Sequence, residues 1–254
     1  MELETWQLVF LSALGVFAGF LNVIAGGGSL LTLPALVLMG LPGPIANGTN
    51  RVAILAQNIT AVAGFRKNGF SDFKLSLTLA LCALPGAVAG AYVGTMVRGA
   101  MFNRILAAIM ILILLQMAWK SRSKSKADST PANETGPPRM LLGHICIVGV
   151  GFYGGFIQAG VGFLLMAVLH NVMRLDLVRV NMHKVFVVGF YTAAALGVFV
   201  WTGNVLWIPG IALAIGNSIG GWIGSHLSVK KGEAFIRKIL YVTLAAMALR
   251  LLWG

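Results

Sequence analysis

Three consecutive glycines, Gly26 to Gly28, interrupt a long uncharged stretch near the start of the chain. Glycine costs a helix about 1 kcal/mol per residue relative to alanine, so a helix that begins near Trp6 is expected to end here. A segment inside a bilayer must satisfy its own backbone, because lipid offers no hydrogen-bond partner. The freed amides must therefore face protein, water or a solute. Ser29 follows directly and is a residue type that caps the start of a new helix.

The composition is that of a membrane protein. The chain is 58% hydrophobic and 10% charged, whereas a soluble domain carries about 25% charged residues. Several uncharged runs approach or reach the roughly 17 to 25 residues that cross a bilayer. The first run follows Glu2 and Glu4, which is the wrong charge for a signal peptide, so we expect it to be retained. The sequence predicts an all-α, polytopic, integral membrane protein.

The net charge of +12 does not indicate a nucleic-acid partner. Most Lys and Arg residues border the apolar segments, where the signals that set membrane topology are found. We therefore expect the partners to be the lipid bilayer and a small anionic solute, with no nucleic acid. A homodimer is an alternative to a monomer that the sequence leaves open.

The apolar segments fall into two sets of five. They cover residues 6–25, 29–39, 52–65, 75–97 and 105–119, and then residues 140–158, 163–173, 185–201, 206–229 and 239–249. A hydrophilic stretch rich in Lys, Ser, Pro, Asn and Thr separates the two sets and is typical of a flexible linker. We divide the chain into a first transmembrane repeat (1–119), a cytoplasmic linker (120–139) and a second transmembrane repeat (140–254), which form one integrated membrane domain.

The two sets also resemble each other residue by residue, at an offset of about 134. The matches pair Gly26 with Gly160, Gly28 with Gly162, Arg51 with Lys184, and glycines 86, 90 and 94 with glycines 216, 220 and 224. Small residues four apart let helices pack closely in lipid. Membrane helices are rich in glycine in any case, which is the alternative explanation. The conserved order of the matches along both halves favours an internal repeat.

A repeat of five segments, an odd number, must insert upside down when it is duplicated. With the linker on the cytoplasmic side, 15 of the 19 Lys and Arg residues fall on that side and 4 outside, as the positive-inside rule requires. We therefore predict two inverted five-segment repeats, with broken or short helices at each glycine-rich motif. Both termini lie outside, and the membrane is the inner membrane of a bacterium. The count does not separate a second segment that crosses from one that turns back midway.

Paired broken helices in inverted repeats are typical of secondary transporters, whose site lies near the middle of the bilayer. Helix N-termini that point inward favour an anion. The alternative is that the glycines serve only close packing. All seven acidic residues lie outside the apolar segments, whereas cation transporters usually keep an acid within the membrane. The expected solute is therefore an anion.

The candidate site residues flank the two interruptions. Asn22 and Gln158 could donate amide N–H groups, and Gln57 and Asn58 lie deeper in the first half. Arg51 and Lys184 could act as gate cations, or could be ordinary interfacial anchors. His183 is a candidate protonatable switch, or a histidine that only forms structural hydrogen bonds with its neighbours. The predicted solute-binding residues are Asn22, Gly26, Gly27, Gly28, Ser29, Asn47, Thr49, Asn50, Arg51, Gln57, Gln158, Gly160, Val161, Gly162, Asn181, His183 and Lys184.

Patterns typical of enzymes are missing from the sequence. It holds no HExxH and no CxxC, and Gly26 to Ser29 lacks the spacing of a dinucleotide loop. We expect no catalytic activity, no cofactor and no metal.

The run from Gly19 to Ser29, followed by Pro34 and the stretch Ala46 to Asn50, resembles the TauE/SafE family of membrane permeases, the sulfite exporter family. Residues 155–162 are similar to the weaker second copy of its motif, although Phe163 stands where the first copy has Ser29. The resemblance implies transport of small sulfur-containing oxyanions or organosulfonates. Together with the inverted repeats, it leads us to expect a secondary transporter, an exporter that works by alternating access. The alternatives are an anion channel, a permease for a carboxylate or a metal, and a non-transporting assembly partner.

Overall fold

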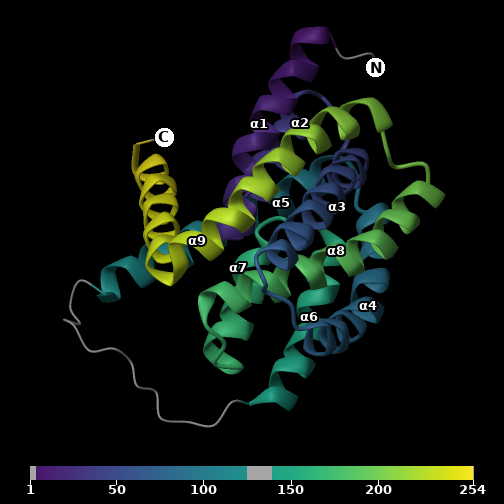
Figure 1. Ribbon diagram of the computed structural model, residues 1–254. Helices are drawn as coiled ribbons and strands as arrows, with labels where there is room; N and C mark the ends of the chain where they lie inside the picture. Colours follow the sequence, from purple (N-terminus) through teal and green to yellow (C-terminus); the bar gives the residue numbers. More distant parts are fainter. Residues whose placement is uncertain (1–3, 125–138, 254) are drawn as a thin grey trace.

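The computed structural model describes residues 4–124 and 139–253, and these residues form helices with no strand among them. The predicted linker lies mostly outside the described residues. The elements are α1 (Thr5–Ile24), α2 (Ser29–Leu38), α3 (Gly43–Lys67), α4 (Phe73–Met96), α5 (Gly99–Lys124), α6 (Met140–Phe156), α7 (Val161–Ala167), the π-helical turn η1 (Val168–Val172), α8 (Leu177–Trp201) and α9 (Trp207–Trp253) (Figure 1). In Figure 1, α9 changes direction before its yellow C-terminal part, which agrees with the two apolar segments expected there.

Two helices begin well before their apolar segments do, α3 by nine residues and α8 by eight. The helix predicted over 52–65 is α3, which starts at Gly43, with Pro44 in its first turn, where the fixed φ of proline suits a helix. The helix predicted over 185–201 is α8, capped by Asp176, whose side chain accepts from the amides of Val178 and Arg179. The polar residues before each apolar run are therefore helical. The apolar pattern missed them because they face other helices rather than lipid.

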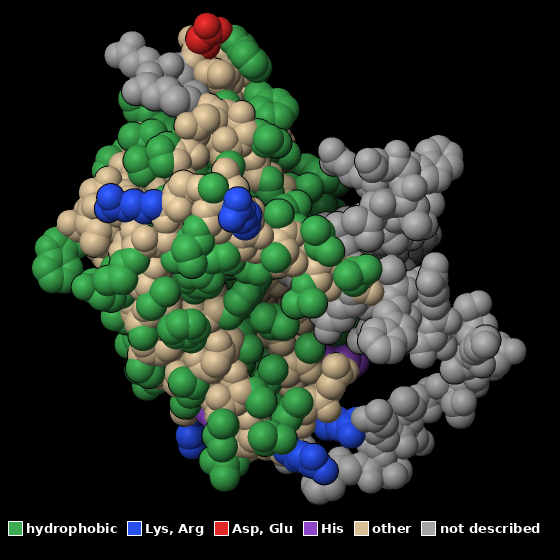
Figure 2. Space-filling view, turned by 180° about the vertical axis from the view of Figure 1, so that it is seen from behind, with side chains coloured by type: hydrophobic (Ala, Val, Ile, Leu, Met, Phe, Trp, Pro, Cys, Tyr) green, Lys and Arg blue, Asp and Glu red, His purple; other side chains and the backbone are tan. Residues whose placement is uncertain are grey.

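The outer surface is that of an integral membrane protein. Among the described residues, three helices, α1, α4 and α8, are long and apolar enough to cross a bilayer, and less than half of each apolar window is buried (39%, 44% and 44%). The rest faces outward, and Phe17, Leu81 and Trp201 are examples of large exposed side chains. In Figure 2, hydrophobic side chains cover much of the visible face between two levels of Lys and Arg side chains. This is the arrangement expected for helices surrounded by lipid.

Glycine rows join the first helix of each half to the fourth segment of the other. α1 packs along α9, and α4 packs along α6. A Cβ at Gly220 would meet the carbonyl of Val16, and one at Gly90 would meet the carbonyl of Phe152. Backbones approach this closely only where no side chain intervenes. The rows of glycine seen in the sequence therefore lie at equivalent helix contacts in the two halves.

Candidate functional site between the two helix breaks

The first break lies where the triple glycine predicts it. α1 ends at Ile24 and α2 begins at Ser29. The amide of Ala25 still bonds the carbonyl of Leu21 (2.7 Å), but Gly26 then adopts a φ of +83°. A left-handed φ is readily reached by glycine and is strained for other residues. The chain therefore leaves the first helix at Gly26 and starts the next one three residues later.

The second break lies slightly earlier than expected. α6 ends at Phe156 and α7 begins at Val161, so Val161 and Gly162 belong to the first turn of α7. Gly160 and Gln158 both have positive φ, +69° and +60°. A non-glycine residue in this region costs about 1–3 kcal/mol and needs support from its surroundings. The Gln158 side chain provides it, because Oε1 accepts from Arg51 (2.8 Å) and Nε2 donates to Thr192 (3.0 Å).

The two breaks touch each other. A Cβ at Gly26 would lie 2.5 Å from the carbonyl carbon of Gly162, so no side chain fits between them. Ser29 Oγ donates to the carbonyl of Gln158 (3.1 Å) and accepts from the amide of Gly160 (2.9 Å). The hydroxyl of Ser29 therefore links the start of α2 to the second break.

A buried Asn–Arg pair of the first half caps the broken helix of the second half. Arg51 Nη2 donates to the carbonyls of Gly154 (3.2 Å) and Gly155. Asn47 Nδ2 donates to the carbonyl of Phe156, the last residue of α6 (2.7 Å). The last carbonyls of a helix lack intrahelical partners and form the negative end of its dipole. A cation stabilises the negative end of the dipole, and the cation and the neighbouring amide together donate hydrogen bonds to the unpaired carbonyls.

The second half makes the same arrangement in the opposite direction. Lys184 Nζ donates to the carbonyl of Val23 (2.7 Å), and Asn181 Nδ2 donates to the carbonyl of Ile24, the last residue of α1 (3.3 Å). Lys184 also donates to Asn181 Oδ1 (2.7 Å). The pairs on α3 and α8 thus each hold the end of the other half's broken helix. This cross-capping explains why the two cations occupy matching places in the sequence.

The centre of the molecule carries positive charge without a buried acid. Arg51 is 0% and Lys184 2% exposed, and no Asp or Glu is buried in the described part of the chain. Neither cation forms an ion pair with a carboxylate of a described residue. A buried charge is costly unless hydrogen bonds or an opposite charge compensate it. Backbone carbonyls provide part of the compensation here, and a bound anion would add to it.

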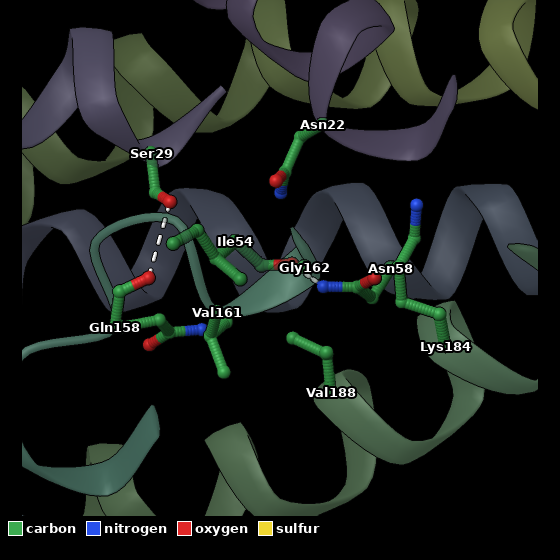
Figure 3. A pocket seen from close by; sticks show the side chains of 9 residues that line it. All are labelled: Asn22, Ser29, Ile54, Asn58, Gln158, Val161, Gly162, Lys184 and Val188. Atoms are coloured by element: carbon green, nitrogen blue, oxygen red, sulfur yellow. Dashed lines mark hydrogen bonds between the residues drawn. The ribbon is translucent and has the colours of Figure 1, made fainter. Parts of the chain in front are cut away.

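A small cavity lies between the two breaks (Figure 3). Its volume is about 10 Å³, which is room for about one water molecule. The lining residues come from both breaks and from α3 and α8; they are Asn22, Ser29, Ile54, Asn58, Gln158, Val161, Gly162, Lys184 and Val188. Six of them belong to the predicted solute-binding set. Asn58, Ile54 and Val188 do not. The sequence singles out Asn58 only as a deeper polar residue, and an apolar residue in an apolar helix gives no signal of its own.

Other predicted site residues make contacts away from this cavity. Thr49 Oγ1 accepts from the amide of Leu206, just before α9 (2.9 Å). His183 faces α4, where Nδ1 lies 2.8 Å from Ser76 Oγ and Nε2 lies 4.0 Å from the Asp72 carboxylate. Asn50 is buried, and its Oδ1 has no partner among the described residues.

Three further predicted residues lie close to the cavity without lining it. Gln57 Oε1 accepts from Asn22 (3.2 Å) and from Asn217 (3.3 Å). A Cβ at Gly27 would lie 2.7 Å from the ring of Phe163, and a Cβ at Gly28 would meet the carbonyl of Ala18. Gln57 therefore orients Asn22, and the two glycines allow close packing around the first break. The described residues contain no group of three His, Cys, Asp or Glu that could hold a metal ion.

Comparison with known proteins agrees with this picture. The family model described as Sulfite exporter TauE/SafE matches residues 11–251. "Probable membrane transporter protein ORF9" of Sinorhizobium sp is 30% identical over 251 residues, covering 99% of this chain and 94% of the relative. "Probable membrane transporter protein YfcA" of Escherichia coli K12 is 28% identical over 263 residues, covering 99% and 95%.

A more distant relative is "Probable membrane transporter protein YunE" of Bacillus subtilis, 23% identical over 267 residues, with 97% and 98% coverage. No solved structure matches the chain. The relatives' names indicate membrane transport rather than catalysis, and the family match extends over nearly the whole chain. The chain therefore belongs to the sulfite exporter TauE/SafE family.

Proposed function

We propose that the protein is a secondary transporter that exports small sulfur-containing oxyanions or organosulfonates by alternating access around the cavity between the two breaks. The observation that carries the proposal is the set of residues that line this cavity: it includes Lys184, Asn22 and Asn58, and no Asp or Glu. Hydrogen-bond donors and positive charge suit an oxyanion. The family description, which names a sulfite exporter, supports the sulfur-containing class.

We also propose that the halves 1–119 and 140–254 are inverted repeats within one membrane domain. In support, α1 starts at the top of Figure 1 and α6 at the bottom. The glycine contacts and the Asn–cation caps each occur twice, once in each direction between the halves. Inverted repeats can exchange conformations and so open a central site to either side in turn. A cavity that holds about one water would then be the closed intermediate.

The proposed topology has the linker in the cytoplasm, both termini outside, and a bacterial inner membrane. Arg51 and Lys184 are buried in helices, so they do not count as loop charges. Leaving them out removes one cation from each side of the membrane, and the excess of Lys and Arg remains on the cytoplasmic side. In intact cells, a membrane-impermeant maleimide should label Arg98→Cys, whereas Lys67→Cys should react only after permeabilisation. The reverse pattern would invert the topology.

The membrane potential alone can drive export of a divalent anion. Leaving a cell at about 100 mV, inside negative, is worth about 4.6 kcal/mol for two charges. Because 1.4 kcal/mol is a factor of ten, this sustains a gradient of roughly a thousandfold. Export therefore needs no coupling ion, although a proton could still take part.

Flux of ³⁵S-labelled sulfite in proteoliposomes tests the proposal. We expect saturable flux that small sulfonates inhibit and acetate does not, and accumulation against a sulfite gradient that stops when a potassium–valinomycin clamp sets the voltage to zero. Flux that follows a pH step at zero voltage would instead indicate proton coupling. Flux equal to that of protein-free liposomes would refute the proposed function, and inhibition by acetate as strong as by sulfonates would favour a carboxylate permease.

A further inference from the structure

The two buried cations have unequal surroundings, although they occupy matching places. We infer that Lys184 is the counter-ion of the transported anion, and that Arg51 is a positioning residue that stays bound to the second break. On this view the anion competes with the end of α1 for the ammonium group. The inference rests on the proposed function, because it assigns roles within the same site.

Both terminal nitrogens of Arg51 are bound by protein groups, and Nε has no partner among the described residues. Its Nη1 donates to Gln158 Oε1 (2.8 Å), and its Nη2 bonds the carbonyls of Gly154 and Gly155. The guanidinium carbon lies 4.7 Å from the centre of the Phe199 ring. Arg51 does not line the cavity. These contacts bind both terminal nitrogens of Arg51 to residues at or next to the second break rather than to the cavity.

Lys184 has a donor to spare and lines the cavity. Its two acceptors, the carbonyl of Val23 and Asn181 Oδ1, each lie 2.7 Å from Nζ and are both neutral. An ammonium has three N–H donors, so one remains. Lys184 is the one charged residue that lines the cavity in the described part of the chain. An anion in the cavity would therefore be the first opposite charge to approach this buried ammonium.

The neighbours of Lys184 add donors on one side and apolar groups on the other. The amide nitrogens of Asn22 and Asn58 each donate once, to Gln57 Oε1 (3.2 Å) and to the carbonyl of Ile54 (2.7 Å). Each NH₂ group has a second N–H available. The apolar lining comes from Ile54, Val161 and Val188. This combination suits an oxyanion head with a small apolar substituent, such as a short alkyl sulfonate.

Binding of such an anion would weaken one of the two helix caps. An anionic oxygen is a stronger acceptor for an ammonium than a backbone carbonyl is. When Lys184 turns to the anion, Val23 loses its cation, and the end of α1 loosens from α8. The Arg51 cap on α6 has no such competitor. The halves therefore respond differently to the same solute, and the α1 side is the one that binding releases.

A comparison of a charged ligand with a neutral one tests the role of Lys184. The purified full-length protein in detergent is titrated calorimetrically with methanesulfonate and with methanesulfonamide, which has nearly the same shape and no charge. Lys184→Met removes the charge. Lys184→Gln removes the charge and keeps an N–H donor for Val23, so α1 stays capped if the first variant fails to fold. Lys184→Arg keeps the charge, and Lys74→Met is the matched control at an exposed lysine.

We expect the wild type, Lys184→Arg and Lys74→Met to prefer the sulfonate. The two uncharged variants should lose sulfonate affinity by about tenfold to a hundredfold, the range for a hydrogen bond to a charged group, with little change for the sulfonamide. An uncharged variant that folds and keeps the wild-type preference would overturn the inference. A wild type that binds no sulfonate and transports no sulfite would instead refute the proposed function.

Discussion

The backbone of Gly26 lies directly against the backbone of Gly162, with space for no side chain between them. One residue belongs to the break after α1 and the other to the first turn after the break that ends α6. The two interruptions, 136 positions apart in the sequence, therefore meet at one point. The cavity, the Ser29 link and both helix caps are arranged around this contact.

Gly26→Ala should separate the two breaks. The new Cβ must adopt a left-handed φ, which costs about 1 kcal/mol, and it must also displace the Gly162 backbone, which adds about 1–3 kcal/mol. Gly69→Ala is the matched control, because Gly69 has a φ of +80° and nothing within 4 Å of a Cβ. We expect the melting temperature and sulfite flux to fall clearly more for Gly26→Ala. Equal effects would mean that the contact between the breaks is unimportant.

Arg51→Lys should not be tolerated as a conservative change. A single ammonium cannot reach Gln158 and the carbonyls of Gly154 and Gly155 with the fork geometry of a guanidinium. Leaving these buried acceptors unpaired should cost about 2–4 kcal/mol, seen as a lower melting temperature in detergent. Arg98→Lys, at an exposed position, is the control and should change little. A melting temperature for Arg51→Lys equal to the control's would contradict the capping role.

Asn47→Ala and Asn181→Ala should have similar costs. Each removes the amide that bonds the last carbonyl of the opposite broken helix, Phe156 in one case and Ile24 in the other. Loss of a buried hydrogen-bond partner costs about 1–3 kcal/mol. Asn103→Ala, on the exposed face of α5, should be nearly neutral in the same thermal-unfolding measurement. If only one of the two variants is destabilised, the two caps are not equivalent.

The glycine rows should be intolerant of even one methyl group. A Cβ at Gly90 or Gly220 would meet a backbone carbonyl of the partner helix, so Gly90→Ala and Gly220→Ala should each destabilise the protein by about 1–3 kcal/mol. Gly197→Ala, in α8 with nothing within 4 Å, should instead stabilise it by about 0.5–1 kcal/mol through helix propensity. A lower free energy of unfolding for Gly90→Ala and Gly220→Ala and a higher one for Gly197→Ala would support the close contacts. A change of the same sign in all three variants would argue against them.

The general plan of the fold could be predicted from the sequence. Glycine clusters end helices for a backbone reason that does not depend on the rest of the molecule, so the first break was predicted at its correct place and the second within a few residues. The short helices after each break followed from the same signal. The rows of glycine likewise indicated close helix contacts before any partner helix was known.

The starts of α3 and α8 were less accessible to sequence reasoning. Asn47, Arg51, Asn181 and Lys184 are polar residues that lower the apolar signal of helices that nevertheless continue through them. They are tolerated because they bond the carbonyls of the opposite broken helix. Those carbonyls belong to the backbone, so the amino-acid sequence does not show which of them need a partner. The cross-capping could therefore be seen only in three dimensions.

The sequence predicted part of the candidate site, because polar residues next to the glycine breaks could be recognised. Asn22, Ser29, Gln158 and Lys184 are polar residues next to glycine breaks, and all four line the cavity. Nearness to a glycine break in the sequence does not show to which side of its helix a side chain points. His183 is next to Lys184 in the sequence, yet it points to Ser76 on α4.

The most direct measurement is an anomalous-scattering map of the protein crystallised with selenite, the selenium analogue of sulfite. We expect a selenium peak between the two breaks, with selenite oxygens within hydrogen-bonding distance of Lys184 and Asn22. We also expect a longer distance from the Lys184 ammonium to the Val23 carbonyl than the 2.7 Å found here. Selenium bound only at the outer surface, with the space between Gly162 and Lys184 unchanged, would contradict the proposed site.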